Sequence, residues 1–343
     1  MGTGSFINRS VVIIVFLIMN PSPLFAAEIY SNAGTTGASF LKIGVGARAV
    51  GIGEAFVAVA DDINSLYWNP AGLSQIQRHE VTAMHSEWLQ GVRYEYIGYV
   101  YPLGNERAIG MSLGLLYFSD VERRTWTTET QLSTSPEGLF GASDFAGTIS
   151  YSQRLWGSLK GGINLKYIYE NIDVYSANDF ALDIGLLYKA FIKNLNLGIN
   201  FQNIGSKIKF REKEYSLPYN VKTGISYKIT ELNLLLALDL NSPVDNYSSI
   251  NTGIEYSYDN ITGRVGYRYK QFGNDLGDLS GLTAGAGFNI SKLLDLFNDS
   301  VDLQLDYAFV PFGDLGFTHR ISLSGKFGTL EPVRKRTSPR RKY

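Results

Sequence analysis

The stretch that decides the fold is VDLQLDY, Val301 to Tyr307, in which apolar and polar side chains strictly alternate. A period of two places all the apolar side chains on one face of a strand. The same alternation recurs along the chain, for example in LNLLLALDL, Leu232 to Leu240. The composition agrees, because 22 Tyr, 19 Phe and 36 Gly against 10 Pro favour strands and tight turns. The sequence therefore predicts an all-β fold.

Soluble sandwiches and membrane barrels both alternate in this way, so strand length and number must distinguish them. Most candidate strands reach the roughly 9 to 11 residues that a tilted membrane-crossing strand needs, whereas strands in soluble sheets average about five or six. Their even number is typical of bacterial barrels, so we expect a 14-stranded antiparallel transmembrane β-barrel over residues 79–328. The fourteen candidates are residues 79–88, 92–102, 107–119, 143–155, 158–172, 177–190, 194–206, 217–229, 231–241, 248–258, 261–272, 280–290, 300–310 and 317–327.

The links between these strands alternate in length, as they do in outer-membrane barrels. Links after even-numbered strands are short, and those after odd-numbered strands are longer. Examples are residues 103–106, 156–157 and 259–260 for the first kind and 120–142, 206–216 and 272–279 for the second. The exception is SKLLDLFND, residues 291–299, which is long and partly helical in character where a short turn is expected.

The first 27 residues have the pattern of a secretory signal peptide. Arg9 precedes an apolar run from Val11 to Met19, and small residues follow at Ala26 and Ala27. A membrane anchor is the alternative, but the run is about half of the ~20 residues that a spanning helix needs. We therefore expect cleavage near residue 27, export, and a location in the outer membrane of a Gram-negative cell.

Two further properties of the composition narrow the classes of function. The chain has no Cys, which excludes disulfides, thiol catalysis and zinc–thiolate sites. The formal net charge is -1, but residues 329–343 are strongly basic and the body is acidic. We predict a disordered periplasmic tail over residues 329–343. Export and the acidic body argue against nucleic acid as its partner.

Residues 28–78 precede the strands, and within them Gly46 to Leu73 (GARAVGIGEAFVAVADDINSLYWNPAGL) is rich in Gly and Ala. Side chains this small allow close backbone approach, which is typical of a segment that fits inside another structure. Gly44 to Ala49 resembles a dinucleotide fingerprint, but the βαβ unit that it requires is missing. Asp61 and Asp62 could bind a cation or form an acid–base pair; the favoured interpretation is a turn in which Asp accepts local N–H bonds.

Several polar side chains on the strands are candidates for the lumen of the barrel. A polar conduit is one interpretation, and cross-pairing of charges inside a filled barrel is the favoured one. His79 and His85 share a strand face and could hold a metal or serve a hydrolase, but no nucleophile motif accompanies them. We expect a non-enzymatic protein without cofactor or metal. The predicted lumen-facing residues are His79, His85, Arg264, Arg268, Lys270, Asp302, Gln304, Asp306, Arg320 and Lys326.

Two sets of short motifs lie near the ends of the mature chain. At the first end these are GARA at 46–49, GIG at 51–53, AFVAVADD at 55–62 and YWNPAGL at 67–73. At the other end they are DYAF at 306–309, PFGDLG at 311–316 and THR at 318–320. Together they resemble the PorV/PorQ family, which is related to the FadL-like outer-membrane transporters. Two positions depart from the family pattern: Glu54 stands where a small residue is usual, and Ile63-Asn64 replaces Ala-Ser.

The resemblance implies a fourteen-stranded barrel that is plugged by an N-terminal hatch with short helical turns. It implies that Asn69-Pro70-Ala71 ends the hatch and holds it against the first strand. The expected hatch or gate residues are Gly46, Arg48, Gly51, Gly53, Glu54, Asp61, Asp62, Trp68, Asn69, Pro70 and Ala71.

Two functions remain open. A PorV-like accessory of type IX secretion would bind exported cargo and the translocon and support cell-surface attachment. A FadL-like transporter would carry hydrophobic small molecules past the hatch. The accessory needs a closed lumen and an apolar loop surface, and the transporter needs a continuous apolar cavity. In either case outer-membrane lipid surrounds the barrel.

Overall fold

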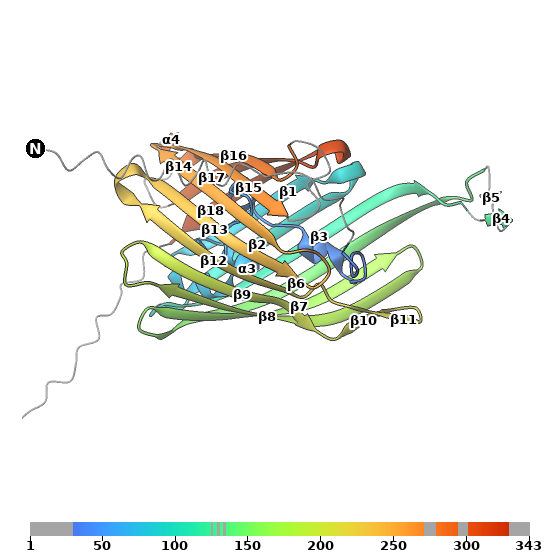
Figure 1. Cartoon of the computed structure of the whole chain (residues 1–343), viewed down its shortest axis with the longest axis horizontal. Coiled ribbons are helices and arrows are strands. Elements are labelled where there is room, and N and C mark those ends of the chain that lie inside the picture. The colour runs from blue at the N-terminus through green and yellow to red at the C-terminus, as the bar shows by residue number, and fades with distance from the viewer. Residues whose placement is uncertain are drawn as a thin grey trace, which may run out of the picture.

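A closed antiparallel barrel dominates the computed structural model, which describes residues 30–124, 126–128, 131–132, 135–270, 279–293 and 301–328. In these residues the barrel wall has fourteen strands (Figure 1). They are β1 (His79–Glu87), β2 (Arg93–Pro102), β3 (Arg107–Glu122), β6 (Leu139–Trp156), β7 (Leu159–Ile172), β8 (Tyr175–Lys189), β9 (Leu195–Gly205), β12 (Asn220–Ile229), β13 (Leu234–Pro243), β14 (Ser249–Tyr258), β15 (Ile261–Lys270), β16 (Leu282–Asn289), β17 (Val301–Pro311) and β18 (Phe317–Phe327).

Each wall strand pairs with its sequence neighbours in the wall, and β1 pairs with β18 to close the barrel. The closing register runs from His79 opposite Phe327 to Glu87 opposite His319. The predicted all-β class and the fourteen-stranded antiparallel barrel are thus confirmed. The alternation explains the wall, because apolar side chains such as Val265 and Ile321 are about half exposed outside while their polar neighbours are buried inside.

The two ends of the barrel differ. We call the end where β1 begins and β18 finishes the turn end, and the opposite end the loop end. At the loop end two small hairpins lie outside the wall, β4 (Trp126–Thr128) with β5 (Gln131–Leu132) and β10 (Lys207–Phe210) with β11 (Lys213–Ser216). At the turn end α4 (Ile290–Leu293) occupies the start of the long 291–299 link, whose last residues lie outside the described ones.

The hairpin of β3 and β6 extends beyond the wall at the loop end. The last pair between β2 and β3 joins Arg93 to Tyr117, whereas β3 and β6 remain paired as far as Glu122 and Leu139. Figure 1 shows these two strands as an arm that leaves the barrel and carries β4 and β5 near its tip. We call residues 118–141 the projecting arm.

Before β1 the chain forms short helices that lie within the barrel. They are η1 (Ser39–Lys42), α2 (Ala47–Gly51), α3 (Ser65–Trp68) and η2 (Pro70–Gln75). α2 packs against β15, β16, β17 and β18, and η2 packs against β3, β6, β7 and β8 on the far side of the wall. We call residues 38–76 the inner segment. Most of its apolar side chains are fully buried, because the wall surrounds it.

The remaining short helices, η3 (Leu89–Gly91), η4 (Thr230–Leu232) and η6 (Gly313–Leu315), lie in links between wall strands. No helix in the described part of the chain is long and apolar enough to cross a membrane. The predicted signal peptide, residues 1–27, and the predicted basic tail, residues 329–343, lie outside the described residues.

Candidate functional site

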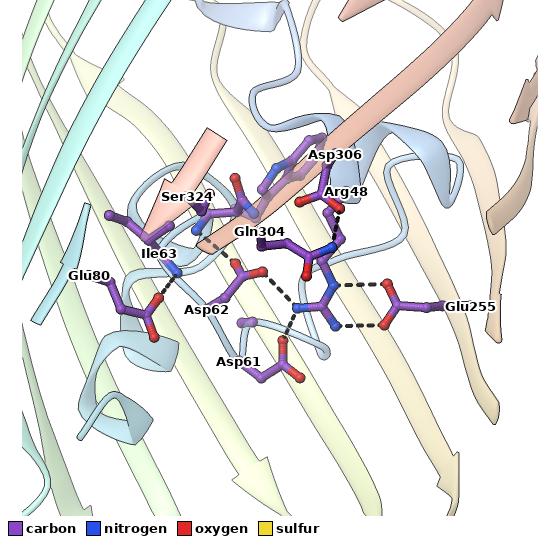
Figure 2. A network of polar contacts seen from close by, with 12 residues as sticks. Arg48, Asp61, Asp62, Ile63, Glu80, Glu255, Gln304, Asp306 and Ser324 are labelled. Atoms are coloured by element: carbon purple, nitrogen blue, oxygen red, sulfur yellow. Dashed lines mark hydrogen bonds and ion pairs between the residues drawn. The ribbon is translucent and has the colours of Figure 1, made fainter. Parts of the chain in front are cut away.

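Arg48 of α2 is the centre of the charged contacts between the inner segment and the wall (Figure 2). Its Nε and Nη2 donate to the two carboxylate oxygens of Glu255 on β14 at 2.9 and 2.8 Å. Its Nη1 donates to Asp61 Oδ1 and Asp62 Oδ2, both at 2.7 Å. Planar guanidinium and carboxylate groups fit this two-pronged geometry, so Arg48 fixes α2 against β14.

The charged contacts continue around the wall from β14 to β1. Arg264 donates to Glu255 and Asp306, each at 2.7 Å. Farther round, Lys326 on β18 pairs with Glu80 on β1 at 3.0 Å. Glu80 also accepts the backbone N–H of Ile63 at 2.8 Å (Figure 2). The predicted cross-pairing therefore describes these residues better than an open polar conduit does.

The charges of this network compensate one another. Burial alone would lower the pKa of Arg48, but Asp61, Glu255 and Asp62 raise it above its ordinary value. Asp62 also accepts the N–H of Asn64 at 2.8 Å, which is the local turn contact expected for this residue. Asp61 is about half exposed and contacts Arg48 from the outer side of the network.

Uncharged amides hold the opposite side of the inner segment. Asn69 is fully buried, and its Nδ2 donates to the carbonyls of Val57 and Leu186 at 2.8 and 3.0 Å. Asn164 on β7 and Asn200 on β9 donate to the carbonyls of Leu66 and Trp68, respectively. Buried backbone carbonyls near the end of a short helix require such donors. The inner segment is thus fixed by ion pairs on one side and amides on the other.

The predicted role of Asn69-Pro70-Ala71 at the first strand is wrong. Asn69 bonds to Leu186 of β8, and Ser152 of β6 accepts the N–H of Ser74 and donates to the carbonyl of Ala71. Counted round the wall from β1, these strands are its third and fifth neighbours, so the motif does not touch the first strand. Asn69 precedes η2, which packs along β3, β6, β7 and β8 before the chain enters β1 at His79.

Glycines in the wall allow the inner segment to touch the backbone of the strands. A Cβ at Gly162 would overlap Pro70, one at Gly185 would overlap Asn69, and one at Gly266 would overlap Gly53. These three glycines lie on β7, β8 and β15, and Gly198 and Gly253 make similar close approaches on β9 and β14. Gly285 on β16 lies against Gly51 less closely, since a Cβ there would be 3.1 Å from the Gly51 Cα. We call these six positions the wall glycines. The small residues predicted in the inner segment, such as Gly53, therefore lie against glycines of the wall.

The remaining hatch candidates have structural roles. Gly46 has a φ of 81°, a conformation that favours glycine, and its N–H points to Met84. Gly51 and Gly53 contact β15 and β16 closely. Trp68 is buried and donates its indole N–H to the carbonyl of Val45 at 2.8 Å, which closes the segment on itself.

Glu54 faces several cations near the loop end. Its carboxylate pairs with Arg268 at 3.0 Å. Burial alone would raise the pKa of Glu54, but Arg268, Arg320, Lys222 and Lys270 together hold it below its ordinary value. Glu54, the residue that departs from the family pattern, is thus the counter-charge of these four cationic side chains.

A cavity of about 540 Å³ opens at the loop end. Residues 39–44, Glu54 and Tyr67 of the inner segment line it on one side, and Lys222, Arg268 and other wall residues line it on the other. A second cavity of about 680 Å³ lies at the turn end between residues 74–77 and the β2–β3 and β6–β7 links. The two cavities share no lining residue, so the inner segment separates them.

The prediction that His79 and His85 face the lumen is wrong. The buried inner face of β1 carries Glu80, Met84 and alternate neighbours, whereas both histidines share the outer face with Val81. His79 stacks on aromatic side chains at the turn end, and His85 contacts Glu95 at 2.8 Å. Polar residues occur on both faces of β1, so the sequence pattern could not show which face points into the lumen.

The other predicted lumen residues lie on the inner faces of their strands. Arg264, Asp306 and Arg320 are buried. Arg268, Asp302, Gln304 and Lys326 are partly buried, while Lys270 is exposed at the loop end. Asp302 accepts from Asn289 at 2.6 Å, and Gln304 donates to Asp306 at 3.2 Å. Among the described residues, no group of three or more His, Asp or Glu could hold a metal ion.

Sequence reasoning missed Glu255 and the wall amides, which contact the inner segment most directly. The sequence did contain a sign of their role, because each is a polar residue at an alternate position that belongs to the buried face of its strand. Alternation alone cannot tell which of many inner polar residues meets a given part of the segment.

The fold and the filled lumen define a class of outer-membrane barrels to which FadL-like proteins belong. The toluene transporter TodX of Pseudomonas putida superposes with a TM-score of 0.56 at 14% identity, covering 82% of this chain and 97% of TodX. TbuX of Ralstonia pickettii gives 0.54 at 14% identity, covering 83% and 99%, respectively. A Pseudomonas aeruginosa FadL homologue gives 0.51 at 11% identity, covering 88% and 99%. At these identities the likeness shows the fold alone.

The family is shown by a separate comparison. The model of type IX secretion system protein PorV matches residues 27–240, which is more than half of the chain, and the chain therefore belongs to that family. A UPF0164 protein of Treponema pallidum (strain Nichols) is 26% identical over 176 residues, which are 49% of this chain and 44% of that protein. The chain thus matches less than half the length of this curated relative. Family and fold together place the protein in the outer membrane.

Proposed function

We propose that this protein is a non-enzymatic accessory of type IX protein secretion, which receives exported cargo at the loop end and supports its attachment to the cell surface. Membership of the PorV family supports the secretion role. The structural observation that carries the proposal is the inner segment, which lies between two cavities that share no lining residue. A barrel with its lumen occupied in this way suits an adaptor that works through its loops.

The alternative, transport of hydrophobic molecules, has less support. Such transport needs a continuous apolar path, whereas Lys222, Arg268, Lys270 and Glu54 line the cavity at the loop end. The titles of TodX and TbuX name toluene transport for those proteins, at 14% identity to this chain.

In this proposal residues 1–27 direct export and are removed. The loop end then faces the cell exterior, because the short links of bacterial barrels are periplasmic. The projecting arm would meet the cargo or the translocon. It is the part of the wall that stands free of its neighbours, and apolar side chains such as Val121 and Leu139 are exposed on it.

A gene deletion that is complemented with variants tests this function. Replacing residues 123–138 by a short turn should abolish surface attachment of cargo while the barrel still folds, as heat-modifiable migration on gels would report. The matched control shortens the turn-end link at residues 190–194 and should leave attachment intact. Normal cargo attachment in the arm variant would contradict the role of the arm. Normal attachment in the deletion strain, with uptake of hydrophobic compounds lost, would contradict the secretion role itself.

A further inference from the structure

Arg320 on β18 is fully buried and lacks a hydrogen-bond partner. Its exposed fraction is 0%, and Nε, Nη1 and Nη2 each contact no acceptor among the described residues. A guanidinium carries five N–H donors and keeps its proton in proteins. A buried charge without a partner is strongly destabilising, so a counter-ion is expected in its place.

The carboxylate of Glu54 does not meet this need. Glu54 acts on Arg320 electrostatically, but its hydrogen-bonded ion pair is with Arg268. The ring of Trp88 lies 5.1 Å from the Arg320 guanidinium carbon and packs at 5.2 Å against Phe312. An aromatic face attracts a cation but accepts no conventional hydrogen bonds, so the N–H groups remain unsatisfied.

Further donors without partners lie beside Arg320 in the wall. Ser86 is its direct register partner on β1, and Thr318 lies two residues earlier on the same inner face of β18. Both hydroxyls are buried and have no hydrogen-bond partner among the described residues. The same inner face thus carries a buried positive charge and two hydroxyls without partners, and an anion requires donors of these kinds.

The surroundings limit the size of that anion. Trp88, Phe312, Arg268 and Glu54 line the loop-end cavity, whereas Arg320 does not. Trp88 lies over the guanidinium, Phe312 packs against Trp88, and Arg268 pairs with Glu54. Because Arg320 is fully buried and does not line the cavity, a monatomic ion suits this site better than a large organic acid.

We propose that Arg320 binds a small monovalent anion of the halide class, chloride in the cell, with Ser86 and Thr318 as additional donors. The bound anion links β18 to β1, where the barrel closes, and neutralises the buried guanidinium. This site is independent of the secretion role, since it requires neither cargo nor translocon.

Thermal unfolding of the purified full-length protein in detergent tests the site. Sodium chloride is compared with sodium gluconate at equal ionic strength, because gluconate is a much larger anion than chloride. The unfolding temperature should rise with chloride and saturate, and Arg320→Gln should remove this response. Thr318→Val, which keeps the side-chain shape, should shift the chloride midpoint several-fold upward. The control Arg93→Gln, an exposed arginine on the outside of β2, should keep the full response.

Bromide provides a second measurement that does not depend on the folding of a variant. Crystals of the wild-type protein grown in sodium bromide should show an anomalous peak beside Arg320. Equal stability in chloride and gluconate, an undiminished chloride response in Arg320→Gln, or density for water alone beside Arg320 would each overturn the proposal.

Discussion

The guanidinium of Arg48 and the carboxylate of Glu255 form a two-pronged ion pair across 207 residues of sequence. One partner lies in the inner segment and the other on β14 of the wall. Both side chains are mostly buried. Glu255 also accepts from Arg264, so one carboxylate contacts two arginines, whose remaining partners are Asp61, Asp62 and Asp306.

Replacing Glu255 by Gln should destabilise the barrel. Breaking a buried ion pair from one side costs about 3–5 kcal/mol in other proteins. We expect a loss near or below the low end of that range, because Arg48 keeps Asp61 and Asp62 and Arg264 keeps Asp306. We expect a clearly lower unfolding temperature and faster hydrogen exchange over residues 47–51. Glu95→Gln is the matched control, because Glu95 pairs with His85 on the more exposed outer face and should change little. Equal effects of the two variants would argue against Arg48 as an anchor.

Alanine at a wall glycine should displace the inner segment. On β15 a Cβ at Gly266 would overlap the backbone of Gly53, whereas one at Gly263 would meet nothing within 4 Å. Gly266→Ala should lower the free energy of unfolding by about 1–3 kcal/mol, the usual cost of overpacking. Gly263→Ala lies on the same strand and should be nearly neutral. The comparison of the two unfolding temperatures measures how closely the segment fits the wall.

Asn69→Ala should loosen the amide side of the segment. It removes two donated hydrogen bonds and leaves the carbonyls of Val57 and Leu186 buried without that donor. Such losses cost about 1–3 kcal/mol for a buried group. Hydrogen exchange should increase over residues 65–75. Asn178→Ala, at an exposed position on β8, serves as the control, and a similar response there would refute the specific role of Asn69.

The attachment of residues 36–42 to the β13–β14 link should depend on pH through Asp245. Burial alone would raise the pKa of this carboxyl, but hydrogen bonds from Lys42 and Thr36, both 2.6 Å, hold it below its ordinary value of 3.8. A carboxyl whose pKa is lowered on folding stabilises the folded form at pH values above its ordinary pKa. This stabilisation is lost as the pH falls through the folded-state pKa. Hydrogen exchange over residues 36–42, corrected for its intrinsic pH dependence, should therefore accelerate below about pH 4.

Asp245→Asn should remove this pH dependence and leave residues 36–42 loosely attached at neutral pH. Asp259→Asn, in the turn between β14 and β15, should behave as the wild type does. If the wild-type pH dependence persists in Asp245→Asn, another group controls the attachment.

The wall could be predicted from sequence because each strand carries its own signal. The candidate at 300–310 became β17 at Val301–Pro311, and the candidate at 317–327 became β18 with the same bounds. Side-chain alternation is a local property, and the lipid-facing side of a barrel imposes it on every strand.

The contacts inside the barrel could not be predicted in the same way. Arg48 was a candidate, but nothing near it in sequence indicates Glu255 as its partner. The face of His79 and His85 was assigned wrongly, because Glu80, Thr82 and Ser86 make the other face of β1 equally polar. The path of the chain after Asn69 depends on contacts with β6 and β8 that form only when the barrel is closed.

The wall glycines have a consequence for how relatives of this protein can be compared and recombined. Each of these glycines lies where the inner segment contacts a strand closely. Their positions in the wall sequence therefore show which strands the segment contacts, and at which residues. A segment of different bulk would need glycines at different positions. Exchanging the first 78 residues between two family members should therefore succeed only when the glycine positions of the recipient barrel are exchanged with them.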